Sequence, residues 1–190
     1  GVMSKIFPIG AATVAAYARQ EIGDELDVEL FKFPEELDKA LSSKIPDILC
    51  LSNYAWNLQI ANIFAMAAKK GKPDLVVVFG GPNFPDSQEE RTQFLKKYSS
   101  IDFYIIGEGE KGFVNLFKKL KKFEMDSGKL QARKESVPNC AYVVGDELIL
   151  GDSSRINNLN QVPCPYQMGL LDPFFSMPLI PIIETTRGCP

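Results

Sequence analysis

The sequence predicts an α/β protein built on a doubly wound, flavodoxin-like (Rossmann-type) parallel sheet of five strands, followed by a small β-hairpin and a linker. The first observation is an alternation of strand-like and helix-like patterns about every 25 residues, which is typical of parallel strands joined by right-handed crossovers. The second is the apolar run at residues 75–79, LVVVF. A run so short and so uniformly apolar indicates a central strand covered on both faces.

The elements of the sheet domain follow in order along residues 1–124. Residues 2–8 are a short and weak first strand. An alanine-rich helix follows at residues 9–21, where small side chains favour close packing against the sheet. The remaining expected strands are residues 26–33, 47–52, 75–79 and 101–106, and the remaining helices are residues 35–43, 58–70, 87–98 and 112–123. Ser87 or Asp86 is suited to cap the helix at residues 87–98.

The character of the chain changes after residue 124. Residues 141–144 and 148–150 flank Gly145-Asp146, a pair that favours a tight hairpin turn. Residues 151–181 are rich in proline and asparagine and are expected to form an extended connector. We therefore predict a sheet domain at residues 1–124, a hairpin and linker at 125–181, and the truncated start of another domain at 182–190.

The composition excludes several classes of function. The chain has 190 residues with a net charge of −3, and its lysines cluster only along one predicted helix, so no nucleic-acid surface is indicated. No apolar run reaches membrane-spanning length, and no signal peptide is evident. The four cysteines are widely spaced, which favours a reduced, cytoplasmic protein. Cys50 is expected to be a buried, unpaired and unreactive core residue.

The chain contains no histidine. This excludes histidine-based zinc sites, Ser-His-Asp and Cys-His catalysis, and acid–base chemistry by imidazole within these residues. Any activity must rely on backbone groups, hydroxyls, carboxylates or a bound cofactor.

Small and polar residues follow three of the predicted strands. They are Ser52-Asn53, Gly80-Gly81-Pro82 and Gly107-Glu108-Gly109. Because parallel strands end at the same edge of a sheet, these residues are expected to line one trough that could take a long, phosphate-bearing ligand.

Each of these residues also has a purely structural explanation. The glycines could simply form tight turns, Glu108 and Glu110 could stabilise a helix N-terminus, and Trp56 could be a hydrophobic lid on the sheet. The alternative for Trp56 is a flat wall against a large planar ligand.

Several stretches together resemble a known family. LSNYAWN, VFGGPNFP and DFYIIGEGEKGFVNLFKKL, in this order, are similar to the cobalamin-binding domain that precedes the barrel in many radical S-adenosylmethionine (SAM) enzymes. NCAYVVGDELIL resembles the hairpin that follows that domain, and NLNQVPCP resembles its linker. TTRGCP is similar to the opening of the radical SAM domain, where the cysteine begins a CxxxCxxC motif.

The resemblance implies a cobalamin-binding module of a radical SAM enzyme. The cofactor-binding residues it implies are Ser52, Asn53, Trp56, Gly80, Gly81, Pro82, Gly107, Glu108 and Gly109. It also implies that Cys189 is a metal ligand, the first cysteine of a 4Fe-4S cluster. The cluster and SAM would belong to the full-length protein, with the downstream barrel as a partner in cis, and methyl transfer is a common reaction of that class.

Two departures from the family limit what carries over. Cobalamin domains that supply a lower axial ligand use the histidine of a DxHxxG motif, and this chain has none, so any cobalamin would be base-off with no histidine ligand from this chain. A single cluster cysteine cannot hold a cluster, so the segment alone is expected to be inert in radical chemistry. Two alternatives stay open: a degenerate domain that serves as a scaffold or recruits substrate, and a free-standing nucleotide- or flavin-binding domain.

Overall fold

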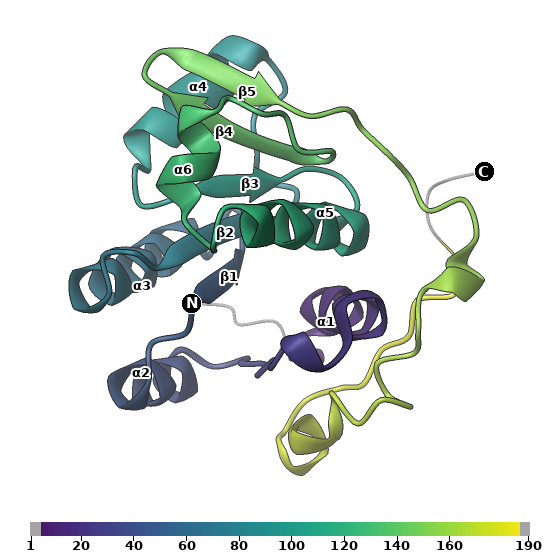
Figure 1. Cartoon of the computed structure of the whole chain (residues 1–190). Helices are drawn as coiled ribbons and strands as arrows, with labels where there is room; N and C mark the ends of the chain where they lie inside the picture. Colours follow the sequence, from purple (N-terminus) through teal and green to yellow (C-terminus); the bar gives the residue numbers. More distant parts are fainter. Residues whose placement is uncertain (1–4, 187–190) are drawn as a thin grey trace. The chain divides into compact units, whose positions relative to one another are not determined.

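The computed structural model describes residues 5–186 (Figure 1). These residues form two compact units, one made of residues 5–37 with residues 156–186 and the other of residues 38–155. We describe each unit by itself. The helix α2 (Pro34–Ser43) lies across the point where the chain passes from the first unit to the second.

The larger unit holds the sheet. Its five strands, in spatial order, are β1 (Ile48–Ser52), β2 (Val76–Gly80), β3 (Phe103–Ile105), β4 (Cys140–Val144) and β5 (Glu147–Leu150). The pairs β1–β2 and β2–β3 are parallel, whereas β3–β4 and β4–β5 are antiparallel. The α/β class and the five-stranded sheet are thus confirmed, and β2 has a strand on each side, as its apolar sequence predicts.

The segments that supply two of the five strands differ from those expected. Residues 26–33 carry no strand, and the segment before α1 forms only an isolated bridge, Ile6 with Ile180. The hairpin, expected as an appendage, supplies β4 and β5 instead. Its apolar face explains this, because it packs into the same core as β2 and β3. The buried residues shared by that core include Val78, Phe103, Leu120, Cys140, Tyr142 and Ile149.

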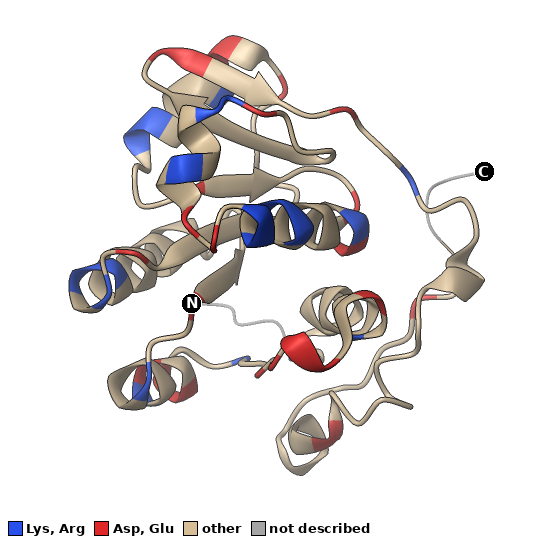
Figure 2. Cartoon of the chain, viewed as in Figure 1, with Lys and Arg blue, Asp and Glu red and all other residues tan. Residues whose placement is uncertain are grey.

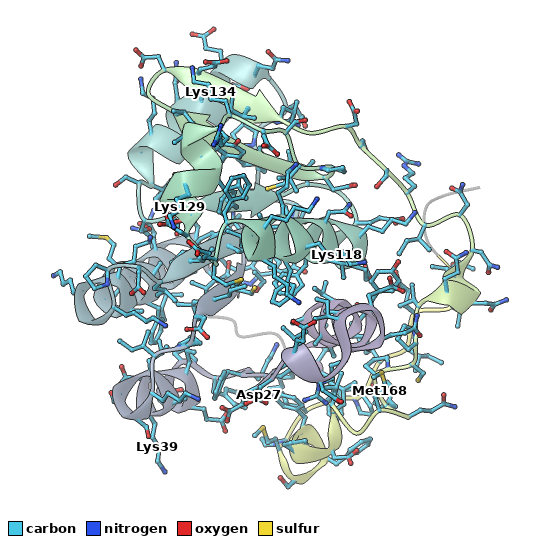
Figure 3. All side chains as sticks on the ribbon, in the orientation of Figure 1. Asp27, Lys39, Lys118, Lys129, Lys134 and Met168 are labelled. Carbon is cyan, nitrogen blue, oxygen red and sulfur yellow. The ribbon has the colours of Figure 1, made fainter. Side chains whose placement is uncertain are left out.

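Four helices accompany the strands of this unit: α3 (Leu58–Gly71), α4 (Gln88–Lys97), α5 (Gly109–Lys122) and α6 (Ser127–Ala132). The hydroxyl of Ser87 accepts a hydrogen bond from the amide of Glu90 and donates to its carboxylate, so Ser87 is the N-cap expected for α4. The helix α5 buries apolar residues on one side and carries the lysine cluster seen in Figure 2. Ion pairs also form on the surface of this unit, including Lys134 with Glu147 and Lys129 with Glu124 (both lysines are labelled in Figure 3).

A partly buried ion pair of this unit, between Lys69 and Asp102, lies where β3 begins. The carboxylate of Asp102 accepts hydrogen bonds from Lys69 at 3.0 Å and from the amide of Val77 at 2.7 Å. Burial raises the pKa of the Asp102 carboxyl from its ordinary value, although Lys69 and the Val77 amide oppose that shift. These contacts tie α3, β2 and β3 together at the end of the sheet opposite the candidate site.

The smaller unit is built around α1 (Ile9–Ile22). Ala15 and Ala16 pack closely, as their size predicts, but against Leu170 and neighbouring side chains rather than against a strand. Residues 182–186 carry no strand and take no part in the five-stranded sheet. No helix within residues 5–186 is long and apolar enough to cross a membrane.

One prediction about a core residue is wrong. Cys50 is a free cysteine but is exposed, not buried. It lies on β1, an edge strand of the sheet in which Leu49 alone is buried, whereas β2 is buried along almost its whole length. The apolar run of β1 was therefore a poor guide to the burial of each of its side chains.

Candidate cofactor site

Three loops meet at the carboxyl edge of the parallel strands. The register places Ser52 opposite Gly80, and Gly80 opposite Ile105, so the ends of β1, β2 and β3 lie side by side. The residues expected to form a trough are thereby brought to one edge. Ser52, Gly81, Pro82 and Gly107 are exposed there, Gly80, Glu108 and Gly109 are half-buried, and Asn53 is buried.

Asn53 connects the first two loops. Its backbone amide donates to the carbonyl of Gly80 at 2.6 Å. Its side-chain Nδ2 donates to the carbonyl of Asn83 at 2.6 Å, and its Oδ1 accepts from Nδ2 of Asn83 at 3.1 Å. Because Asn53 is fully buried, these bonds satisfy groups that water cannot reach. Asn53 is therefore a structural clamp, and its side chain is already engaged within the protein.

Tyr104, on β3, completes this clamp. Its hydroxyl donates to the carbonyl of Gly81 at 2.9 Å and accepts from Nδ2 of Asn53 at 3.0 Å. Phe84 stacks on its ring with centroids 3.8 Å apart. Burial raises the pKa of Tyr104 to about 12, so its hydroxyl stays protonated near neutral pH and acts as a donor.

Gly81 is required by the fold. Its φ is +130°, a conformation that other residues rarely adopt, and a Cβ at this position would lie 2.5 Å from the carbonyl oxygen of Asn53. A Cβ at Gly81 would thus meet the backbone of the first loop. The missing side chain allows the first and second loops to approach each other.

The third loop is held by Asn139, which lies just before β4. Its Nδ2 donates to the carbonyls of Ile106 at 3.2 Å and Ser154 at 2.9 Å. Gly107 has a φ of +71° and lies beside it. Glu108 occupies the N-cap position of α5, but its side chain makes no capping hydrogen bond.

The aromatic residues of the first loop form an exposed platform. Tyr54 and Trp56 stack with ring centroids 4.8 Å apart and planes 11° apart. Trp56 is 70% exposed, so it is not a lid buried on the sheet. Asn57 holds the turn: its Oδ1 accepts from the amide of Tyr54 at 2.7 Å, and its Nδ2 donates to the carbonyl of Ser52 at 2.9 Å.

Sequence reasoning missed five residues that shape this edge: Tyr54, Asn57, Asn83, Tyr104 and Asn139. Asn83 directly follows Gly80-Gly81-Pro82, and an asparagine beside a glycine turn was a usable signal. Tyr104 lies within an apolar strand and gave no such signal. Among residues 5–186, no group of three or more histidine, cysteine, aspartate or glutamate side chains could hold a metal ion. Cys189 lies outside the described residues.

A comparison with family models identifies the domain family of the residues that form this edge. Residues 2–117, more than half of the chain, match the model of the B12 binding domain. The chain belongs to this family. The match covers all three loops, so the residues at the carboxyl edge lie within the B12-binding domain.

Two curated proteins that are similar to this chain are methyltransferases. The chain is 28% identical to the cobalamin-dependent radical SAM methyltransferase TokK of Streptomyces tokunonensis, over 96% of this chain and 27% of that protein. It is 27% identical to the 2-(S-pantetheinyl)-carbapenam-3-carboxylate methyltransferase of Streptantibioticus cattleyicolor, with the same two coverages. The chain thus spans about a quarter of the length of these relatives.

A solved structure shares the fold. The cobalamin-dependent S-adenosylmethionine radical enzyme OxsB, in its apo, selenomethionine-labelled form, superposes with a TM-score of 0.58 at 25% identity. The superposition covers 82% of this chain and 21% of OxsB. This B12-binding domain is therefore similar in sequence and in fold to parts of much longer radical SAM proteins.

Proposed function

We propose that the chain binds cobalamin along the carboxyl edge of β1, β2 and β3, as the cofactor-holding module of a radical SAM methyltransferase. The observation that carries the proposal is the agreement between the B12-binding family match and the geometry of this edge. There, three loops expose small residues around a fully hydrogen-bonded clamp. The scaffold alternative is not favoured, because it requires this edge to have lost the ligand that defines the family.

The residues present suit the shape and chemistry of cobalamin. This cofactor combines a broad, flat corrin with a long, polar, phosphate-bearing tail. The exposed Tyr54–Trp56 pair provides a flat aromatic surface. Ser52 provides a hydroxyl, and Gly81 and Gly107 leave space beside the backbone. The helix α5, 14 residues long, begins at Gly109, and helix N-termini favour phosphate groups.

We assign the remaining contacts by position. Gly80, Pro82, Glu108 and Gly109 border the same loops and would line the cofactor site, whereas Asn53 would act by holding the loops in place. Because the chain has no histidine, the lower axial position of cobalt would receive no imidazole from this chain, and the cofactor would bind base-off.

The proposal extends to the longer protein that the relatives suggest. A radical SAM barrel would follow in cis, starting at residue 182, after the sheet with its hairpin strands and the linker that follows them. Cys189 would be the first ligand of its 4Fe-4S cluster, and SAM would bind in that domain. When bound, cobalamin supplies a methyl-carrying metal centre, and the share of this chain is to hold and orient it. We propose a cytoplasmic location for this oxygen-sensitive chemistry.

Incubating the purified chain with hydroxocobalamin, desalting it and recording the visible spectrum tests the proposal. We expect corrin absorbance to elute with the protein in a ratio near one to one. Elution of the protein without corrin absorbance, at ligand concentrations of about 1 mM, would contradict cobalamin binding.

A further inference from the structure

The outward face of α3 is apolar and open. Trp56 in the preceding turn is 70% exposed, and Ile60, Ile63 and Met66 along the helix are 42%, 64% and 50% exposed. The spacings of four, three and three residues place these side chains on one side of the helix. The opposite side is formed by Ala61, Ala65 and Ala68, which are buried. We call the four exposed residues the α3 stripe.

The absence of charge distinguishes this face from those of α4 and α5. Residues 48–68 contain no aspartate, glutamate, lysine or arginine. In Figure 2 the charged positions of α3 are confined to its end, where Lys69 and Lys70 lie. By contrast, α4 and α5 carry charged residues along their length. A solvent-exposed helix face normally carries charged and polar residues. Contiguous exposed apolar patches, by contrast, mark interaction sites.

We infer that the α3 stripe is a docking surface for a further domain of the longer protein, packed against this module in cis. This inference rests on the proposed function. The two curated relatives extend well beyond the matched region, since the chain spans 27% of each of them. A further domain in the same polypeptide would be held close to the α3 stripe and would therefore be present at a high effective concentration.

The position of the stripe agrees with that partner. Trp56 belongs both to the stripe and to the loop that we assign to the cobalamin site, and it stacks on Tyr54 there. A domain that covers the outer side of the cofactor would therefore meet the stripe at Trp56 and continue along α3. The partner face should be apolar and weakly charged, because the stripe offers no charged side chain to pair with.

Thiol labelling of Ile63→Cys tests this inference directly. The variant is prepared in the 190-residue chain and in the full-length gene product, and both are treated with iodoacetamide. Mass spectrometry of peptides separates this site from the native cysteines. We expect labelling of Ile63→Cys to be at least about tenfold slower in the full-length protein. Gln88→Cys, on the exposed start of α4, is the control and should react at the same rate in both.

Equal rates for Ile63→Cys in the two proteins would overturn the inference, and so would equal slowing of Gln88→Cys, which would mean general protection. Slowing that depends on the concentration of the 190-residue chain alone would identify a second copy as the occupant. Met66→Cys repeats the test if Ile63→Cys fails to fold by circular dichroism. Cobalamin binding by the 190-residue chain is measured separately, so failure of the docking inference is distinguishable from failure of the proposed function.

Discussion

Asn53 and Asn83 hold each other by reciprocal hydrogen bonds. Nδ2 of Asn53 donates to the carbonyl of Asn83 at 2.6 Å, and Oδ1 of Asn53 accepts from Nδ2 of Asn83 at 3.1 Å. The pair joins the loop after β1 to the loop after β2, and Tyr104 adds a link from β3. These hydrogen bonds thus link the first two loops of the candidate site to each other and to β3.

Replacing Asn53 with alanine should destabilise the sheet unit. The change removes both side-chain hydrogen bonds to Asn83 and leaves buried groups without partners, at a cost of about 1–3 kcal/mol. Denaturant unfolding followed by circular dichroism measures the loss. Asn115→Ala, at a partly buried position on α5, is the control and should change stability by less than about 0.5 kcal/mol. Equal effects of the two changes would mean that the clamp contributes little.

The effects of Tyr104→Phe and Asn53→Ala on stability should not be additive. The phenol hydroxyl bonds both to Asn53 and to the carbonyl of Gly81, so each variant removes a bond that the other also loses. The double variant should therefore be less destabilised than the sum of the single variants, by about 0.5 kcal/mol or more. Strict additivity in a double-mutant cycle would show that the two residues are independent.

Gly81→Ala should cost more stability than Gly145→Ala. Both glycines have positive φ, +130° and +61°, but a Cβ at Gly145 would meet nothing within 4 Å, whereas one at Gly81 would lie 2.5 Å from the oxygen of Asn53. Gly81→Ala adds both the clash and a less favourable backbone conformation to the ordinary left-handed strain of Gly145→Ala, and we expect the difference to be at least about 1 kcal/mol. Thermal unfolding of the two variants measures it, and a smaller loss at Gly81 would refute the close approach of the two loops.

The sequence predicted the α/β class and the meeting of three strand ends, because both follow from local patterns. The apolar run at residues 75–79 and the glycines after it need no tertiary information to be interpreted. The sequence predicted the hairpin but not its place in the sheet as β4 and β5, because a hairpin pattern does not say which strand the hairpin will pair with. The clamp was missed for a related reason: Asn53 and Tyr104 lie 51 residues apart and meet only in the folded sheet.

The stability of the protein should depend on pH through Asp102. Its pKa is raised by burial, so as the pH falls the folded chain takes up this proton before the unfolded chain does. The contribution of Asp102 to stability therefore increases as the pH falls through the raised pKa and is lost as the pH rises. Wild type should gain stability relative to Asp102→Asn between about pH 7 and about pH 4. Unfolding midpoints of both proteins across this range test the sign, and an opposite trend would mean that Lys69 outweighs desolvation.

Ser52→Ala probes the proposed site with little effect on the fold. The Ser52 hydroxyl is exposed and accepts only a long contact, 3.4 Å, from Nδ2 of Asn57. Loss of one hydrogen bond to cobalamin should weaken binding by about 0.5–1.5 kcal/mol, a factor of about 2–13 in Kd. Isothermal titration with hydroxocobalamin measures the change, and unaltered thermal stability without ligand is the control. An unchanged Kd would remove Ser52 from the site.

Equilibrium dialysis of the wild-type chain against hydroxocobalamin tests the central claim most directly. Serum albumin at equal concentration is the control for non-specific retention. We expect saturable binding of one cobalamin per chain, with a ligand-dependent rise in thermal stability, since a ligand that binds only the folded state must stabilise it. Retention no greater than that of albumin, together with an unshifted melting curve at about 1 mM ligand, would contradict the account.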